Sequence, residues 1–300
     1  MNLNNLYFEE YHDEKKEAII FLHSNLLSHW IWKYQKSSFP NHHCIFLDLP
    51  EHGKSQLDGD FSIEKSAEIV KDLIREKLMT KKIHLVGVAI GGQIILQLLA
   101  KYPNLIETAT VTGVNLQTPL IKFNEDKKLA KLIYDVENEK VDQSLAMIKQ
   151  LKVDILDKKH SDFIIKGYLA EYGLEKEYLK DLRDSISSIY EDKLISITEE
   201  SLKFKLPEIC TTFDNKENND KMDSNNLLVL YGTKEYPKVK KSAETIKNYF
   251  NNAQIFSVYR SIHLWNIHDF EWFNEVISEF ISKKKLNLNE KPYLKRFSSD

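Results

Sequence analysis

The stretch Ile83-His84-Leu85-Val86-Gly87-Val88-Ala89-Ile90-Gly91-Gly92-Gln93 decides the fold of this chain. Its apolar run ends in glycines, and an apolar-periodic segment over residues 94–101 follows, a pattern typical of a strand, a tight turn and a helix. Gly87 and Gly91 have the spacing of G-x-S-x-G, in which a serine nucleophile stands on the sharp turn between strand and helix. The central residue here is Ala89, which has no nucleophilic atom. The sequence therefore predicts the geometry of a nucleophile turn without its nucleophile.

Strand-like and helix-like segments alternate on both sides of this stretch. Short continuous apolar runs, as expected for strands buried on both faces of a parallel sheet, cover residues 18–22, 44–48, 108–112 and 227–231. Further strands are expected over residues 6–11 and 253–258, and helical spacing marks residues 62–78, 239–250 and 270–283. This alternation predicts an α/β fold with a mostly parallel sheet flanked by helices.

The pattern changes between residues 116 and 204, where glycine nearly vanishes. Helical spacing recurs there over residues 127–136, 142–151, 161–172 and 177–190. We expect this region, residues 116–204, to be a helical cap inserted into a core made of residues 1–115 and 205–285. The polar run over 214–226 is most simply a solvated loop. The C-terminal tail, residues 286–300, is expected to be frayed or peripheral, as is the chain from Lys284 on.

Composition and charge narrow the class of protein. The chain is 42% hydrophobic and 29% charged, with a formal net charge of −3, which gives no reason to expect nucleic acid or a membrane as partner. Cys44 and Cys210 are the two cysteines, and neither lies in a CxxC or Cys/His cluster, so no disulfide or structural zinc is expected. We also expect no other metal and no cofactor. The N-terminus lacks the features of a signal peptide, and no apolar run approaches about 18 residues. A cytoplasmic location follows as the expectation.

Five short blocks, taken in order, resemble the α/β-hydrolase superfamily, and most of all small hydrolases of low-GC bacteria. The resemblance spans roughly residues 6 to 282 and implies an α/β-hydrolase fold. Five blocks in the right order are specific as a set, although each alone would be a weak signal. They are residues 21–32, 48–55, 87–93, 232–236 and 262–266.

The resemblance implies a catalytic triad at three positions. Ala89 stands at the nucleophile position, His263 at the general base and Glu235 at the acid, in the chain order expected for this fold. A serine hydroxyl needs an imidazole to take its proton, and the imidazole needs a carboxylate to fix its tautomer and stabilise its charge. Asp214 and Asp223 stay open as alternative acids.

The same resemblance implies an oxyanion hole and a substrate pocket. The backbone N–H groups of Asn25 and Ile90 would form the oxyanion hole. His23 and Trp30 are candidates near the substrate, although His23 can equally support the oxyanion loop and Trp30 can equally be packing. Ser24 departs from the family pattern, because it replaces the usual glycine after His23 and can reshape the loop. Further aromatic candidates, each of which could be core instead, are Tyr168, Tyr172, Tyr190 and Phe204.

Three functional readings remain open at this point. The chain can be a serine hydrolase for a small apolar ester, lactone or thioester that is inactivated by alanine at position 89. It can be a non-hydrolytic protein that binds a small apolar ligand. It can also use His263 as a general acid/base without any serine. The first reading is favoured because the rest of the site is retained in the sequence.

Overall fold

A computed structural model describes residues 3, 5–55, 61–116, 174–207, 226–235 and 237–297. One eight-stranded sheet runs through it in the order β1-β3-β2-β4-β5-β6-β7-β8. Strands β2 to β7 are parallel to their neighbours, while β1 pairs antiparallel with β3 and β8 pairs antiparallel with β7. The strands are β1 (Phe8–Tyr11), β2 (Glu17–Leu22), β3 (His43–Leu47), β4 (Lys82–Val88), β5 (Thr108–Thr112), β6 (Asn226–Gly232), β7 (Gln254–Val258) and β8 (Leu294–Arg296). The predicted α/β architecture with a mostly parallel sheet is confirmed.

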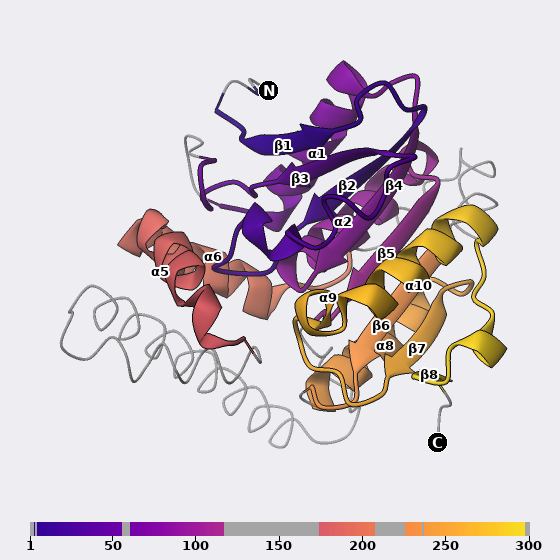
Figure 1. Cartoon of the computed structure of the whole chain (residues 1–300). Coiled ribbons are helices and arrows are strands. Elements are labelled where there is room, and N and C mark those ends of the chain that lie inside the picture. Colours follow the sequence, from indigo (N-terminus) through magenta and orange to yellow (C-terminus); the bar gives the residue numbers. More distant parts are fainter. Residues whose placement is uncertain are drawn as a thin grey trace, which may run out of the picture.

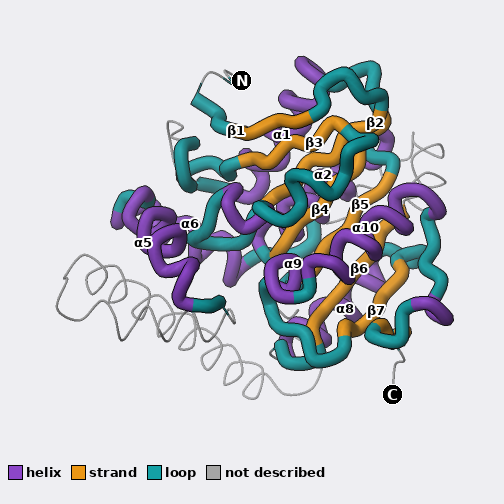
Figure 2. Tube along the Cα trace, viewed as in Figure 1, coloured by secondary structure: helices purple, strands orange, loops and turns teal. Residues whose placement is uncertain are grey.

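Helices cover both faces of this sheet. In Figure 1, α10 lies in front of the strands, while α1, α2 and α8 lie behind them. Figure 2 shows the same arrangement, with the strands side by side between the helices. The α-helices of the core are α1 (Ile63–Lys77), α2 (Ile90–Lys101), α8 (Pro237–Tyr249), α9 (Trp265–His268) and α10 (Phe270–Lys283), and the 3₁₀ turns are η1 (His29–Trp32), η2 (Pro103–Leu105) and η4 (Leu288–Glu290). None of the helices in the described part of the chain is both long and apolar enough to span a bilayer.

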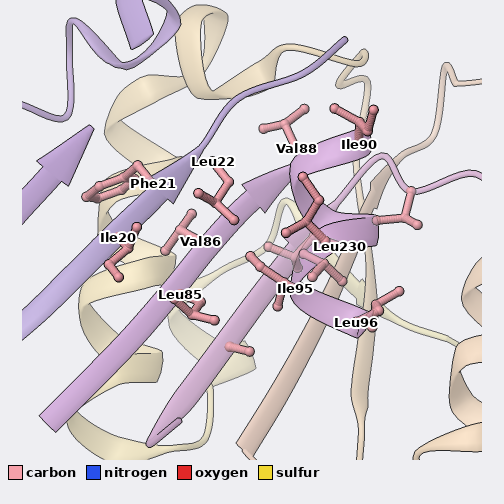
Figure 3. Close-up of a cluster of buried hydrophobic side chains, with 14 of the residues drawn as sticks. Ile20, Phe21, Leu22, Leu85, Val86, Val88, Ile90, Ile95, Leu96 and Leu230 are labelled. Carbon is pink, nitrogen blue, oxygen red and sulfur yellow. The ribbon is translucent and has the colours of Figure 1, made fainter. Parts of the chain in front are cut away.

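Apolar residues buried between these layers hold the central strands in place. Except for Lys82 at its exposed start, every residue of β4 is buried, as a strand covered on both faces requires. The close-up in Figure 3 shows side chains from β2, β4, α2 and β6 packed together, with Val88 and Ile90 on either side of the bend at the end of β4. The turn that carries Ala89 is therefore anchored in the core on both sides.

Part of the region expected to be a cap lies within the described residues. Its described helices are η3 (Lys176–Tyr178), α5 (Leu179–Ser188) and α6 (Glu191–Lys203). Side-chain bonds tie this part to the sheet domain: Trp30 Nε1 donates to Ser185 Oγ at 2.8 Å, and Gln93 Nε2 donates to the Ser201 carbonyl at 2.9 Å. The helices expected over residues 127–136, 142–151 and 161–172, and the loop over 214–226 up to residue 225, lie outside the described residues.

Residues 288–297 of the C-terminal tail, which we expected to be frayed or peripheral, form η4 and the edge strand β8. Strand β8 extends the sheet, and Lys291, only 2% exposed, pairs with Glu275 at 2.8 Å and with Glu279 at 2.5 Å. The ring of Tyr293 stacks on Trp272 with centroids 4.4 Å apart. Composition could not reveal this anchoring, because it depends on carboxylates of α10 that are distant in sequence.

Candidate active site

Five parallel strands bring the three predicted triad positions, together with Ser24 and Gly113, to one edge of the sheet. Ser24 follows β2, Ala89 follows β4, Gly113 follows β5, Glu235 follows β6 and His263 follows β7. The carboxyl ends of neighbouring parallel strands meet at the same edge, where α/β proteins build their sites. Residues far apart in sequence therefore share one small region.

Ala89 occupies a sharp and strained bend between β4 and α2. Its φ of 49° and ψ of −112° are unusual for a residue with a side chain, and such a conformation costs on the order of 1–3 kcal/mol. The Ala89 N–H donates to the Thr112 carbonyl at 2.9 Å, and the Ala89 carbonyl accepts from the Gln93 N–H at 2.9 Å. The fold therefore maintains a strained backbone conformation at residue 89 although the side chain there has no hydroxyl. This is the geometry expected of a functional site.

Gly91 lets the start of α2 approach the end of β2. A Cβ at this position would lie 2.2 Å from the carbonyl oxygen of Leu22 and 2.8 Å from that of His23. No side chain fits in this space, so the glycine predicted from the motif has a steric reason. The close approach also places the loop after His23 directly beside the nucleophile turn.

The predicted base and acid are in contact. His263 Nδ1 lies 2.8 Å from Glu235 Oε1, and the second carboxylate oxygen accepts the backbone N–H of Gly232 at 2.7 Å. The Glu235 side chain is 3% exposed and that of His263 is 19% exposed. A carboxylate acceptor keeps the proton on Nδ1 and leaves Nε2 as the basic nitrogen. The alternative acids Asp214 and Asp223 lie outside the described residues.

Trp265 and Asn266 hold the loop that carries His263. Trp265 Nε1 donates to Thr112 Oγ1 at 2.9 Å, and Asn266 Nδ2 donates to the Ile31 carbonyl at 2.8 Å. Both residues are fully buried. The Trp-Asn pair that follows the histidine in sequence is therefore structural, and it fixes the histidine against the ends of β5 and η1.

Ser24 is the contact that the sequence did not predict. Its Oγ lies 3.3 Å from His263 Nε2, on the side of the imidazole opposite Glu235. The sequence showed a departure from the family glycine at this position, but not which residue the hydroxyl would meet. No pattern of local spacing could have found a pair separated by 239 positions.

His23 does not present a ring nitrogen to a substrate. It is fully buried, its Nε2 accepts the Leu49 N–H at 2.9 Å, and its Nδ1 donates to the Ser24 carbonyl at 2.8 Å. Direct substrate binding by His23 therefore does not fit the structure, whereas support of the loop does.

Trp30 donates its indole N–H to Ser185 of α5 and stacks on Tyr178, with centroids 5.8 Å apart. It links η1 to the described helices η3 and α5.

The two N–H groups predicted to form the oxyanion hole come from the loop after β2 and from the start of α2. Ile90 is the first residue of α2, and the first N–H groups of a helix have no acceptor inside it. Asn25 follows Ser24 in the loop, and its buried Oδ1 has no hydrogen-bond partner within the part of the chain that the structure describes. Donors at a helix start beside a loop N–H are suited to a developing oxyanion.

A buried aspartate fixes the turn after β3. Asp48 Oδ1 accepts the backbone N–H and the Nδ1 of His29, each at 2.7 Å, and Oδ2 accepts the Lys54 N–H at 2.9 Å. Burial alone would raise the pKa of the Asp48 carboxyl, but the bonds from His29 and the other donors hold that pKa below its usual value. The block over residues 48–55 therefore has a structural role.

One cluster of potential metal ligands lies away from this site. Ligand atoms of Glu17, His42 and His84 all lie within 4.8 Å of one another. Glu17 begins β2 and His84 lies near the start of β4, so the cluster is at the opposite end of the strands from Ala89. Glu17 already pairs with Lys82 at 3.2 Å. The cluster plays no part in the arrangement around His263.

Three buried histidines make stability depend on pH. Burial lowers the pKa of His23 and His84 to about 4 and that of His52 to about 3. In the unfolded chain the pKa of a histidine is about 6.5. Below that pH the unfolded chain binds protons that the buried imidazoles of the folded chain do not bind. The free energy of unfolding is therefore highest above the unfolded pKa, and it decreases as the pH falls toward 4.

Thermal unfolding between pH 8 and pH 4.5 tests this dependence. We expect the midpoint to fall by about 10 °C or more below pH 6.5. His52→Leu should flatten the curve, because it removes one of the three groups. An unchanged midpoint down to pH 4.5 would contradict the assignment of three neutral imidazoles.

Known proteins share this architecture. Residues 17–147 match the family model described as alpha/beta hydrolase fold. The described structure aligns with the esterase EaEST from Exiguobacterium antarcticum at a TM-score of 0.71, with 16% identity over 93% of this chain and 96% of that one. The protein has the α/β-hydrolase fold. This agreement confirms the α/β-hydrolase fold that the resemblance in the sequence implied.

Curated relatives match a shorter part of this chain. An AB hydrolase superfamily protein of Gibberella zeae is 28% identical over 114 residues, which are 37% of this chain and 40% of that protein. A putative 2-succinyl-6-hydroxy-2,4-cyclohexadiene-1-carboxylate synthase of Haemophilus influenzae is 30% identical over 110 residues, 37% of this chain and 44% of that protein. The matched segments thus span less than half the length of these two relatives.

Proposed function

We propose that this chain is a hydrolase of the carboxylic-ester type, acting on a small apolar ester, lactone or thioester. His263 is the general base and Glu235 its acidic partner. The observation that carries the proposal is the contact between His263 Nδ1 and Glu235 Oε1, which lie 2.8 Å apart. This contact is at the same edge of the sheet as the turn of Ala89. The esterase among the structural neighbours supports the same reaction class.

The proposed chemistry uses the imidazole twice. His263 Nε2 takes the proton of an attacking hydroxyl, and the proton then passes to the leaving alcohol or thiol. The N–H groups of Asn25 and Ile90 stabilise the oxyanion that forms on the carbonyl. Water activated by His263 then hydrolyses the acyl-enzyme. These groups supply a mechanism that needs no metal or cofactor.

Residue 89 cannot supply the attacking hydroxyl, because alanine has none. Residue 89 therefore cannot act as the nucleophile for ester hydrolysis. The site is a hydrolase site that lacks a nucleophile at the usual position. A cytoplasmic setting remains our prediction, on the basis of the two isolated cysteines.

Ala89→Ser tests the reaction class directly. We expect it to raise hydrolysis of short-chain p-nitrophenyl esters and lactones by at least about 100-fold, because a hydroxyl at the bend gains the base and the oxyanion hole. A fluorophosphonate should then label residue 89, as mass spectrometry of the peptide would show. Ala89→Gly is the matched control, since it changes the same position without adding a hydroxyl. Ester binding by Ala89→Ser without turnover or labelling would instead identify a ligand-binding protein.

A further inference from the structure

The hydroxyl that faces the base in this chain belongs to Ser24. We propose that Ser24 is the nucleophile of this protein, and that Ser24, His263 and Glu235 form a relocated catalytic triad for small carboxylic esters. The proposal rests on the proposed function, because it takes over the same base, acid and substrate class. It differs in placing the acyl group on the loop after β2 rather than on the turn after β4.

Each link of such a triad is present in the structure. The Gly232 N–H fixes one oxygen of Glu235 at 2.7 Å, and the other oxygen accepts Nδ1–H of His263 at 2.8 Å. The lone pair of Nε2 then faces Ser24 Oγ at 3.3 Å, so the serine hydroxyl is the donor. A nucleophile in reach of a base that a third group orients is the signature of an activated hydroxyl.

The backbone around Ser24 is held rigidly. The Ser24 carbonyl accepts a bond from His23 Nδ1 at 2.8 Å and another from the Leu27 N–H at 3.3 Å. The carbonyls of Leu22 and His23 lie against Gly91, where a Cβ would come within 2.2 and 2.8 Å of them. Because the loop is fixed on both sides, the hydroxyl is positioned before any substrate arrives.

Water is the only reactant that the reaction needs besides the ester. Ser24 Oγ attacks the ester carbonyl carbon while its proton passes to His263 Nε2. The bond from carbon to the leaving oxygen breaks, and the leaving alkoxide takes that proton from Nε2. A water then gives a proton to Nε2 and adds to the acyl carbon, and the bond to Ser24 Oγ breaks as the proton returns to the serine.

Burial of Ser24 sets the expected size of its substrates and its rate. The residue is 1% exposed, whereas Ala89 is only partly buried. Access to Ser24 Oγ is therefore narrower than access to a hydroxyl at position 89. We expect small acyl groups and small sulfonyl fluorides to react at Ser24, and bulky fluorophosphonates to react there slowly.

Labelling of the unaltered chain tests the proposal. Methanesulfonyl fluoride should add to the peptide that contains Ser24, and the chain should hydrolyse p-nitrophenyl acetate at a rate that Ser24→Ala lowers by at least about 10-fold. Ser28→Ala is the matched control: Ser28 is another buried serine of the same loop, 6% exposed, and should leave labelling and rate unchanged. Thermal unfolding of each variant separates loss of the hydroxyl from loss of the fold.

Ser24→Cys keeps the test decisive even if Ser24→Ala folds poorly. Its thiol should react with iodoacetamide faster when His263 is present than in Ser24→Cys/His263→Ala. The proposal is overturned if the unaltered chain takes no label at Ser24 and Ser24→Ala hydrolyses the acetate at the unaltered rate. If Ala89→Ser is nevertheless active and labelled at residue 89, only the relocation fails; if neither position ever reacts, the proposed function fails with it.

Discussion

His263→Ala in the Ala89→Ser chain is expected to abolish the ester hydrolysis that Ala89→Ser gains, which lowers the rate by at least about 100-fold. The reason is geometric. Glu235 Oε1 lies 2.8 Å from His263 Nδ1 and keeps the proton on that nitrogen, so Nε2 is the basic nitrogen at this edge of the sheet. Without the imidazole, a serine hydroxyl keeps its proton and is a weak nucleophile. Initial rates with p-nitrophenyl acetate, compared at equal concentrations of folded protein, measure the loss.

A matched variant separates this effect from the general loss of a histidine. His268→Ala removes an exposed histidine five positions further along the same segment and should leave the regained rate unchanged. Glu235→Gln should lower the rate by a smaller factor, because the amide still fills the space but no longer stabilises the imidazolium. Survival of the Ala89→Ser activity in His263→Ala would remove His263 from the mechanism.

The strands and helices of the fold could be predicted because they rest on short-range patterns, whereas the candidate triad positions came from the resemblance to a family. The run before Ala89 ends at a glycine turn, and an apolar helix begins at once, so the strand, bend and helix follow from about eleven consecutive residues. The strand over 108–112 and the helix over 270–283 have the bounds expected from their spacing. Buried strands and amphipathic helices are the elements whose sequence signal is strongest.

The contacts made across the sheet edge could not be predicted in the same way. Ser24 and His263 are 239 positions apart, and the bond between them depends on how strands β2 and β7 end. The anchoring of Lys291 to Glu275 and Glu279 has the same origin, since a charge run gives no indication of its distant partners. Family patterns identify the positions of a triad, but a side chain that departs from the pattern is assigned a partner only by coordinates.

Gly113→Ala is expected to disable the site through the base rather than through the nucleophile. Gly113 follows β5 with a φ of +63°, and a Cβ there would lie 2.8 Å from His263 Nδ1 and 2.9 Å from Glu235 Oε1. A methyl group at this point must displace the imidazole from its carboxylate. The left-handed backbone adds a cost of roughly 1–2 kcal/mol. In the Ala89→Ser background we expect the rate per folded molecule to fall by at least about 10-fold, because a small misplacement of a catalytic group costs that much or more.

Gly53→Ala provides the control for the backbone effect. Gly53 also has a positive φ, of +56°, and a Cβ there would lie 2.4 Å from Asp48 Oδ2, away from His263. Both substitutions should lower the unfolding midpoint, but only Gly113→Ala should lower the rate per folded molecule, measured by titrating the folded fraction before each assay. Equal rates in the two variants would mean that the His263–Glu235 contact tolerates displacement, and the base would then have to act from a position other than the one it occupies beside Gly113.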